Sequence, residues 1–323
     1  MDGKLNETQH KKNYYYGHLQ LKRVETDPKV TANIMRIGIT GSSGFLGSHL
    51  TKALRQYTNA EVTVLRRNSL ESFPTINELS SFVNGLNLIY HVAGVNRGTN
   101  EKILRGNVEV TFNLIEAIKK SKKPCPRIVF TSSSQVYKPL AKPGKVINES
   151  HKTEPATLFG VTKKTAEDLI RLSGFEHVIL RIANIYGPGC CPEYNSVIAT
   201  FCHRAINGNP ITIDGDGHQK RDFIYVEDAI QAMVLAGTKR DKFVSGVYNV
   251  GTGHTTSLRQ MIRNIKAAGV EVEVTYTPKA SAGQNSFSLD ASRFRKCFGW
   301  KPKILTSAGI KNTLLWFRKK ATL

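Results

Sequence analysis

The sequence predicts an α/β fold, a doubly wound parallel sheet with a smaller lobe nearer the C-terminus. The first sign is an apolar strand pattern at 36–40 that runs into three glycines and then into an apolar helical pattern. The second is that strand and helix patterns alternate as far as about residue 180, which is typical of parallel strands covered by helices. The third is that this alternation stops after Gly187-Pro188-Gly189, so the remaining chain is expected to form the smaller lobe.

The individual elements follow from the period of their apolar residues. Short apolar runs predict strands at 36–40, 61–65, 87–92, 127–131 and 177–182. Longer segments with an apolar stripe predict helices at 45–57, 76–84, 101–120 and 157–173. Right-handed crossovers place the carboxyl ends of these strands at one edge of the sheet, so a ligand crevice is expected there.

Three glycines after the first strand, Gly41, Gly44 and Gly47, predict a phosphate-binding turn. Glycine lets the backbone turn sharply, lets a pyrophosphate approach, and lets the helix lie close to the strand. The N-terminus of the next helix offers free N–H donors and a partial positive charge to phosphate groups. The sequence therefore predicts a bound dinucleotide. The cofactor contacts expected in this turn are Gly41, Ser43, Gly44, Phe45, Leu46 and Gly47.

The end of the second predicted strand bears on the choice between NAD and NADP. A carboxylate at that position would bind the adenosine ribose and disfavour a 2′-phosphate. Arg66 and Arg67 stand there instead, and a guanidinium can bind a phosphate in bidentate fashion. NADP is therefore favoured, with NAD as the alternative. Two exposed loop arginines would be the simpler explanation of the pair.

Small and polar residues follow the third predicted strand. Ala93 and Gly94 are small enough for the chain to run beside the cofactor, whereas His91 is expected to be a packed core histidine. Asn107 is a poor helix former inside a predicted helix. It is therefore expected to hydrogen-bond a neighbouring strand end or, as the less favoured alternative, the cofactor.

Composition limits the partners and the compartment. The chain has 323 residues and a net charge of +21, which attracts phosphate-bearing partners without identifying them. No apolar run reaches the roughly 20 residues needed to cross a bilayer, and no secretory signal pattern is found, so no membrane partner is expected. Five cysteines without metal-ligand spacing favour free thiols, a cytoplasmic location and no metal site.

These patterns also predict the domain organisation. Residues 1–34 are polar, show neither period, and are expected to form a largely disordered extension. Residues 35–184, together with 221–245, are expected to form the dinucleotide-binding domain. Residues 185–220 and 246–323 are expected to form the smaller lobe, which would bind the substrate.

Several motifs, taken in order, resemble those of the extended short-chain dehydrogenase/reductases, and among them the NAD(P)-dependent sugar-nucleotide epimerase/dehydratase group. The resemblance covers about Met35 to Lys319. It implies a Rossmann-type sheet, a nicotinamide cofactor and a nucleotide-diphosphate sugar as partner. Besides the glycine turn, the motifs are HVAG at 91–94, SSSQVY at 132–137, LRIANIYGPG at 180–189, RDFIYVEDA at 221–229, YNVGTG at 248–253, DASR at 290–293 and GWKP at 299–302.

The resemblance also implies a mechanism. A serine four residues before a tyrosine, here Ser133 before Tyr137, binds the reacting sugar hydroxyl, and Ser134 is expected to assist in holding the substrate. A second, catalytic tyrosine takes the proton while the nicotinamide takes a hydride. A lysine four residues after it binds the ribose and lowers the tyrosine pKa. Lys163 matches this lysine, but the tyrosine position is occupied by Phe159.

Phenylalanine cannot carry a proton, and losing a general acid/base typically costs about 10²–10⁴ in rate. Three explanations of Phe159 stay open. It is an introduced change that traps a bound complex; it is native and another group, such as Tyr137 or a cysteine, serves as the acid; or the protein binds its ligands without redox chemistry.

The smaller lobe is expected to hold the nucleoside diphosphate. Asn184 and Arg221 match family positions that face the sugar phosphates, with an ion pair between Arg221 and Asp222 as the alternative. An arginine that many relatives carry later in the chain is absent, and Lys279 is the nearest cation. The diphosphate contacts and the nucleotide base are therefore left open.

The leading hypothesis is a sugar-nucleotide epimerase or ketoreductase that works by hydride transfer. Ser134 and Gln135 stand where a dehydratase would carry acidic residues, which counts against dehydration. The resemblance also implies a homodimer through the helices at 101–120 and 157–173. The alternative is a non-catalytic dinucleotide-binding regulator or a nucleic-acid binder, which Phe159 and the basic charge favour, although no interleaving of aromatic and basic residues supports nucleic-acid binding.

Overall fold

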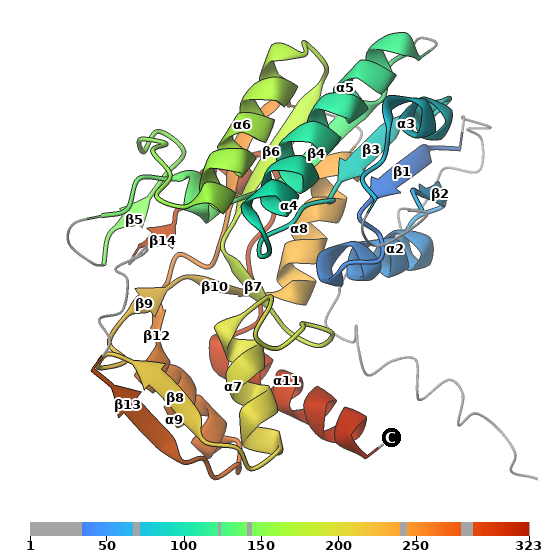
Figure 1. Ribbon diagram of the computed structural model, residues 1–323. Coiled ribbons are helices and arrows are strands. Elements are labelled where there is room, and N and C mark those ends of the chain that lie inside the picture. Colours follow the sequence, from blue (N-terminus) through green and yellow to red (C-terminus); the bar gives the residue numbers. More distant parts are fainter. Residues whose placement is uncertain are drawn as a thin grey trace, which may run out of the picture.

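A six-stranded parallel sheet covered by helices on both faces forms the larger part of the molecule, and a smaller lobe lies below it (Figure 1). The computed structural model describes residues 34–66, 72–121, 124–140, 144–239, 244–278 and 287–322. The predicted α/β fold is confirmed. The predictions for the extension 1–33, for Arg67 and for Lys279 lie outside the described residues.

The strands of the main sheet are all parallel and follow the spatial order β11-β6-β4-β3-β1-β2. From β1 the chain goes outward to β2 and then returns to β3 on the other side of β1. This reversal is the switch point at which open α/β sheets bind ligands. All five predicted strands are confirmed. The strands are β1 (Arg36–Thr40), β2 (Glu61–Val64), β3 (Leu88–His91), β4 (Arg127–Ser133), β6 (His177–Ile182) and β11 (Gly246–Val250).

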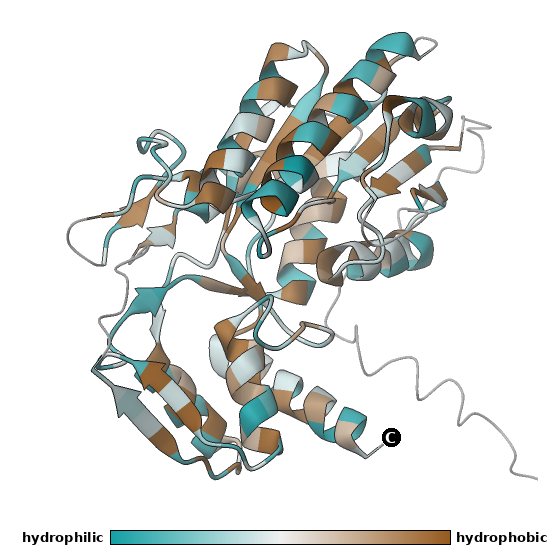
Figure 2. Ribbon diagram, viewed as in Figure 1, coloured by the Kyte–Doolittle hydropathy of each residue, from teal (hydrophilic) through white to brown (hydrophobic). Residues whose placement is uncertain are grey.

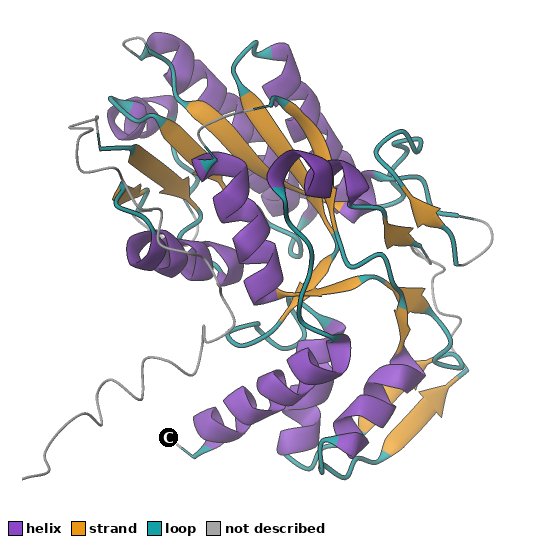
Figure 3. Ribbon diagram, turned by 180° about the vertical axis from the view of Figure 1, so that it is seen from behind, coloured by secondary structure: helices purple, strands orange, loops and turns teal. Residues whose placement is uncertain are grey.

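Helices cover both faces of the sheet because each carries an apolar stripe (Figure 2). On one face, α2 (Phe45–Tyr57) and α8 (Val226–Thr238) bury side chains such as Leu50 and Met233. On the other face lie α3 (Ile76–Val83), α5 (Val110–Lys120) and α6 (Leu158–Leu172). The view from behind shows the sheet between its two helical layers (Figure 3). The helix predicted at 101–120 is α4 (Asn100–Leu104), a π-helical turn (Arg105–Glu109) and α5 in succession.

The smaller lobe has an apolar core of its own, to which Phe201, Met261 and Leu314 contribute. The two strands of the lobe, β8 and β13, pair in parallel. Its helices pack around them (Figure 1). The lobe elements are α7 (Val197–Ile206), β8 (Ile211–Asp214), α9 (Leu258–Ala267), β13 (Val274–Thr277) and α11 (Thr306–Ala321).

The boundary predicted for the lobe at residue 246 is wrong in two places. Strand β11 pairs with β6 inside the main sheet, where Tyr248 is fully buried. Helix α10 (Ser292–Phe298) returns to the main core, because Phe294 and Phe298 pack their rings against Tyr248 and Trp300 packs edge-to-face against Phe294. The chain therefore crosses between the two parts more often than the sequence pattern indicates.

Short strand pairs connect the two parts. Strand β7 (Asn184–Tyr186) pairs with β10 (Phe223–Tyr225), and β9 (Lys220–Arg221) pairs with β12 (Thr256–Ser257). Strand β5 (Val146–Ile147) pairs with β14 (Ser288–Leu289). No helix formed by the described residues is both long and apolar enough to span a membrane.

Candidate active site

The glycine turn after β1 is packed so closely that side chains would not fit. Gly41 has a φ of +74°, and a Cβ atom added there would lie 2.6 Å from the backbone nitrogen of Ala93. A Cβ atom on Gly47 would lie 2.0 Å from the Gly41 carbonyl oxygen. Gly44 is different: it is exposed, and a Cβ atom there would meet only the Gly41 oxygen at 3.4 Å. The turn therefore joins β1, β3 and α2 through backbone contacts and leaves one open side at Gly44.

The open side faces the start of α2. Gly44 is the N-cap of α2, and no side chain among the described residues caps this helix end. The first N–H groups of α2 can therefore donate to a ligand, and the helix dipole favours a negative one. These residues fit the pyrophosphate of a dinucleotide by backbone approach, as the sequence predicts.

His91 is a packed core histidine, as predicted. Its Nδ1 lies 2.8 Å from Thr40 Oγ1 and its Nε2 lies 2.9 Å from Thr111 Oγ1. Burial, reinforced by the charge of Lys163, lowers the pKa of His91 to about 3, so the ring is neutral in the folded protein. The imidazole connects β1, β3 and α5 and has no ring nitrogen left for catalysis.

Asn107 makes the structural bonds that the sequence analysis favours. Its amide nitrogen lies within hydrogen-bond distance of Val95 O at 2.7 Å, Ile103 O at 2.9 Å and Thr162 Oγ1 at 3.1 Å, and its Oδ1 accepts from Val95 N at 3.1 Å. With three acceptors around two N–H groups, the amide has no donor left for a ligand. The alternative of a cofactor contact is therefore corrected: Asn107 holds the loop after β3.

Lys163 is buried on α6, beside the end of β4. Its Nζ donates to Thr131 O at 2.9 Å and lies 4.7 Å from the centroid of the Phe130 ring. A Cβ atom on Gly94 would lie 2.9 Å from this nitrogen, so only glycine fits beside it. Burial lowers the pKa of Lys163 to about 8, while the negative charge of Glu167 raises it.

A buried charge cluster supports Lys163 from the next turn of α6. The Glu167 carboxylate accepts from Ser132 Oγ at 2.5 Å and from Arg181 Nη2 at 2.7 Å and Nε at 3.0 Å. Both partners of this ion pair are at most 7% exposed. Glu167 and Arg181 are not among the predicted site residues. Two features of the sequence indicate them: Glu167 is four residues after Lys163, hence on the same helix face, and Arg181 is a charged residue inside a predicted buried strand.

Ser133 and Phe159 frame the outer part of the site. Ser133 ends β4 and its Oγ accepts from Gln135 N at 3.2 Å; Ser134 begins the next turn and is buried. Phe159 lies in the first turn of α6, and Lys163 Nζ is 5.9 Å from the centroid of its ring. Phe159 and Lys163 therefore lie one turn apart on α6, and Lys163 contacts Thr131, two residues before Ser133 on β4.

Tyr137 is unsuitable as a substitute acid, and that hypothesis is corrected. Its side chain is fully buried and its hydroxyl donates to Asn249 Oδ1 at 2.6 Å. Burial raises the pKa of Tyr137 to about 12. The cysteine alternative has similar difficulties, since burial raises the pKa of Cys190 to about 12 and the Cys191 thiol contacts Pro192 O. All five cysteines are free thiols.

On the lobe side, Arg221 and Asp222 do not form the ion pair that was the alternative. The Asp222 carboxylate instead accepts from the backbone nitrogens of Leu289 at 3.0 Å and Thr252 at 3.1 Å. Burial lowers the pKa of Arg221, and no described side chain within salt-bridge distance neutralises it. Asn184 donates to Asp222 O at 2.9 Å, which fixes its amide near Arg221. Arg221 therefore suits an anionic ligand.

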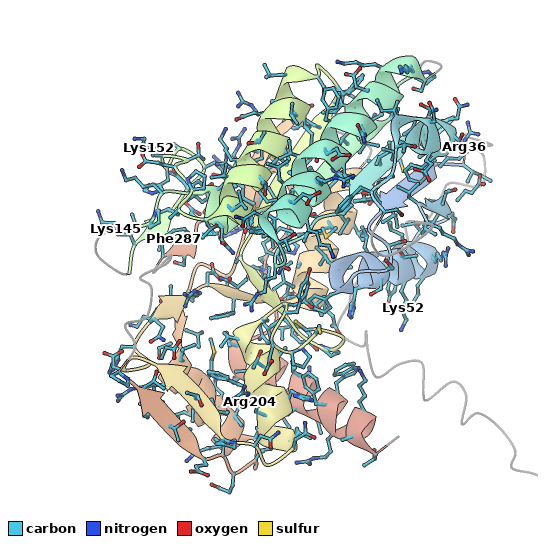
Figure 4. All side chains as sticks on the ribbon, in the orientation of Figure 1. Arg36, Lys52, Lys145, Lys152, Arg204 and Phe287 are labelled. Carbon is cyan, nitrogen blue, oxygen red and sulfur yellow. The ribbon has the colours of Figure 1, made fainter. Side chains whose placement is uncertain are left out.

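The segment after Pro188 crosses from the lobe to the crevice. Pro188 O lies 2.8 Å from His49 Nε2 on α2, and Glu193 O accepts from Arg97 at 2.6 Å. The Glu193 carboxylate pairs with Arg204 of α7, which Figure 4 labels in the lobe. A separate hollow of about 500 Å³ lies on the outer side of α2, where Figure 4 labels Lys52, and reaches Ser42 of the turn. It contains none of the groups around Lys163.

Known proteins show the same fold and family. A model of the NAD dependent epimerase/dehydratase family matches residues 37–251. The chain is 30% identical over 308 residues to a putative UDP-glucose 4-epimerase of Methanocaldococcus jannaschii, covering 87% of this chain and 97% of that protein. The UDP-glucose 4-epimerase of Thermotoga maritima, solved with UDP-glucose, is similar with a TM-score of 0.78 at 26% identity, covering 89% of this chain and 100% of that one.

A second similar structure carries a tyrosine-to-phenylalanine substitution. It is a tyrosine-to-phenylalanine variant of the Bacillus cereus UDP-glucuronic acid 4-epimerase, in complex with NAD and UDP-4-deoxy-4-fluoro-glucuronic acid. Its TM-score is 0.76 at 25% identity, covering 88% of this chain and 100% of that one. The motifs, the sheet order and these matches agree, so the chain is an extended short-chain dehydrogenase/reductase and belongs to the NAD-dependent epimerase/dehydratase family.

Proposed function

We propose that the protein is a sugar-nucleotide epimerase or ketoreductase that uses a nicotinamide dinucleotide and acts by hydride transfer at a sugar carbon. One observation carries this proposal: Gly41 of the phosphate turn packs against Ala93, and the next residue, Gly94, packs against the buried amine of Lys163, at the switch point of the sheet. Relatives named as UDP-sugar epimerases, decarboxylases and reductases support an enzymatic function.

The residues then take distinct roles. The sheet part binds the dinucleotide, with the turn from Gly41 to Gly47 at the pyrophosphate and Ala93 and Gly94 beside the nicotinamide half. Lys163 donates to a ribose hydroxyl. A nicotinamide bound there supplies hydride transfer to or from the sugar. The lobe binds the nucleotide-diphosphate sugar, and the substrate contacts are Ser133, Ser134, Asn184 and Arg221.

Phe159 takes the place of the tyrosine that carries the proton in relatives. The ring lies in the first turn of α6, one turn before Lys163, which is the spacing that the mechanism requires. Phenylalanine fills nearly the volume of tyrosine, so the fold accepts it, while the site loses its usual proton carrier. Slow turnover follows from this loss.

The test is the variant Phe159→Tyr. With UDP-glucose or UDP-glucuronic acid as probe, we expect it to raise turnover by about 10²–10⁴ over the parent, because it restores a general acid/base. Products are followed by NMR and the cofactor by nicotinamide absorbance. If both proteins bind the dinucleotide and neither converts a nucleotide sugar, the proposed function fails.

NADP is the proposed cofactor, although similar structures are described with NAD. Arg66 lies two residues after the end of β2, is exposed, and stands where a carboxylate would bind the adenosine ribose. We expect Arg66→Asp to weaken NADP binding about tenfold and to leave NAD binding within about threefold, since one charged contact is worth about 1.5–3 kcal/mol at most. Equal losses for both cofactors, measured by calorimetry, would exclude this role.

A homodimer through α5 and α6 is proposed as well. These helices and α4 expose large apolar side chains at Leu104, Phe112, Val161 and Leu172, which are 45–86% exposed. Unpartnered apolar side chains on adjacent helices favour burial against a second copy. Light scattering of Val161→Glu against the parent tests this, with a shift to monomer expected. The free thiols favour a reducing compartment such as the cytoplasm.

A further inference from the structure

The site lacks a phenol oxygen at Phe159, yet a sugar hydroxyl that is oxidised must lose a proton. This inference rests on the proposed function and concerns which group of this chain moves that proton. A candidate must be titratable, must lie at the crevice and must have a free position for the proton. Residue 159 is a phenylalanine and cannot carry the proton, so another described group must do so.

Most of these groups are already engaged. The Tyr137 hydroxyl donates to Asn249 and is fully buried. Both ring nitrogens of His91 are hydrogen-bonded, to Thr40 and to Thr111. His49 Nε2 lies 2.8 Å from Pro188 O. Cys190 is 1% exposed. Each of these groups is used by the fold or is shielded from a ligand.

Lys163 meets the conditions. Its Nζ makes one hydrogen bond, to Thr131 O at 2.9 Å, among those found in the described residues, which leaves two further positions on the amine for hydrogen or a lone pair. Thr131 and Ser133 are two residues apart in β4, so they are separated by about 6.6 Å along the strand. The amine also lies 5.9 Å from the centroid of the Phe159 ring, the side chain that occupies the expected tyrosine position.

We propose that the amine of Lys163 itself exchanges the proton with the substrate hydroxyl in this protein. In the oxidative direction, the neutral Nζ takes the O–H proton and becomes an ammonium, while the adjacent C–H leaves as hydride to the nicotinamide ring and the C–O bond becomes a carbonyl. In the reductive direction, the ammonium returns the proton to the oxygen as the hydride returns to carbon. The two electrons and the proton are balanced in each direction.

The surroundings of Lys163 suit this role. Burial lowers its pKa to about 8, so that both forms are present near neutral to mildly alkaline pH. The groups facing it from each packed element are Glu167 on α6, which raises the pKa, and neutral His91 on β3. Arg181 on β6 is paired with Glu167. From β4 it meets a carbonyl oxygen and the Phe130 ring.

The first experiment measures the protonation of Lys163 without turnover. The protein is labelled with ¹³C at the lysine ε-carbons, and the Lys163 signal is assigned as the one missing from Lys163→Arg. We expect its shift to titrate with a midpoint near pH 8. A Lys163 that stays protonated above pH 10 overturns the proposal.

The second experiment separates proton transfer from binding. Arginine keeps a positive charge and N–H donors, but it does not release a proton at accessible pH. In Lys163→Arg we expect the first-turnover formation of reduced nicotinamide at pH 9 to fall at least 100-fold, with dinucleotide affinity within about threefold. In the parent this rate should rise tenfold per pH unit up to about pH 8 and then level off.

The double variant Phe159→Tyr/Lys163→Arg controls for folding. Tyrosine then moves the proton, so this variant should recover first-turnover chemistry although it carries the same arginine. Equal rates in the parent and in Lys163→Arg overturn the proposal. An inactive Phe159→Tyr that still binds the dinucleotide contradicts instead the proposed function, so the two failures are distinguishable.

Discussion

The two sides of the crevice are built differently. Around β1 and β3 the backbone forms the site. Gly41 and Gly47 let main-chain atoms of the turn pack in contact, and His91 of β3 lies within hydrogen-bond distance of Thr side chains on β1 and α5. Around β4 and α6 side chains form the site. The Glu167 carboxylate accepts hydrogen bonds from Ser132 and Arg181, and the Lys163 amine lies over the Phe130 ring. The first side depends on shape, and the second depends on charges buried together.

This difference has a functional consequence. A backbone-built side binds phosphate groups that all dinucleotides share, so it changes little when the chemistry changes. A side-chain-built side can gain or lose one atom, such as the oxygen absent from Phe159, without loss of the fold.

Glu167→Gln should destabilise the protein most. It leaves Arg181 as a buried charge without its carboxylate, which typically costs about 3–5 kcal/mol of unfolding free energy. The matched control is Asp168→Asn, next in sequence, whose carboxylate is 40% exposed and pairs with Lys164 and Arg171. Exposed pairs contribute below about 1 kcal/mol. Denaturant unfolding of the two variants measures the difference, and similar losses would contradict a buried cluster.

Gly47→Ala should lower the free energy of unfolding by disturbing the backbone packing around β1 and β3. Its Cβ would lie 2.0 Å from Gly41 O, an overlap that backbone atoms must relieve, and we expect a cost of about 3 kcal/mol. Gly44→Ala is the comparison, because its Cβ meets only ordinary contact at 3.4 Å. Thermal unfolding should leave Gly44→Ala near the parent, while calorimetry shows weaker dinucleotide binding. A stable Gly47→Ala would refute the packing argument.

His91 should make the protein sensitive to acid. Its pKa is about 3 when folded and about 6.5 in an unfolded chain, so the unfolded state binds the extra proton between these values. The free energy of unfolding therefore falls as the pH drops below 6.5, by up to about 1.4 kcal/mol per pH unit from this group. In His91→Gln the slope between pH 6.5 and 5 should be smaller by that amount. An unchanged slope in urea unfolding would exclude the effect.

Thr157→Ala should have the smallest effect. Thr157 is the N-cap of α6: its Oγ1 accepts from Gly160 N at 3.0 Å and donates to Gln135 at 3.1 Å. Losing an N-cap side chain costs about 1 kcal/mol. Thr165→Ala, inside the same helix, lacks this role and should change stability by a few tenths of a kcal/mol in favour of the variant. Comparable unfolding midpoints for both would argue against the cap.

The sequence predicts the backbone-built side better than the other. Gly41 and Gly47 are visible in the sequence because no other residue allows the contacts they make, and Gly44 because it completes their spacing. Spacing also indicates Lys163 and Ser133. Glu167 and Arg181, by contrast, look like ordinary charged positions, because their burial arises only when α6 packs against β6. The sequence likewise does not show that Tyr137 is buried, so it is wrongly considered an available acid. It also does not show that β11 pairs with β6, so β11 is wrongly assigned to the lobe.

Asp222 has a consequence for how the whole chain moves. One carboxylate binds the backbone of Thr252 and Gly253, which follow β11, and of Leu289 in β14, a separate segment of the chain. A hinge between the two parts would have to break several of these bonds at once. The lobe and the sheet are therefore expected to open and unfold as a single cooperative unit, with ligand exchange governed by the segment after Pro188 rather than by rotation of the lobe.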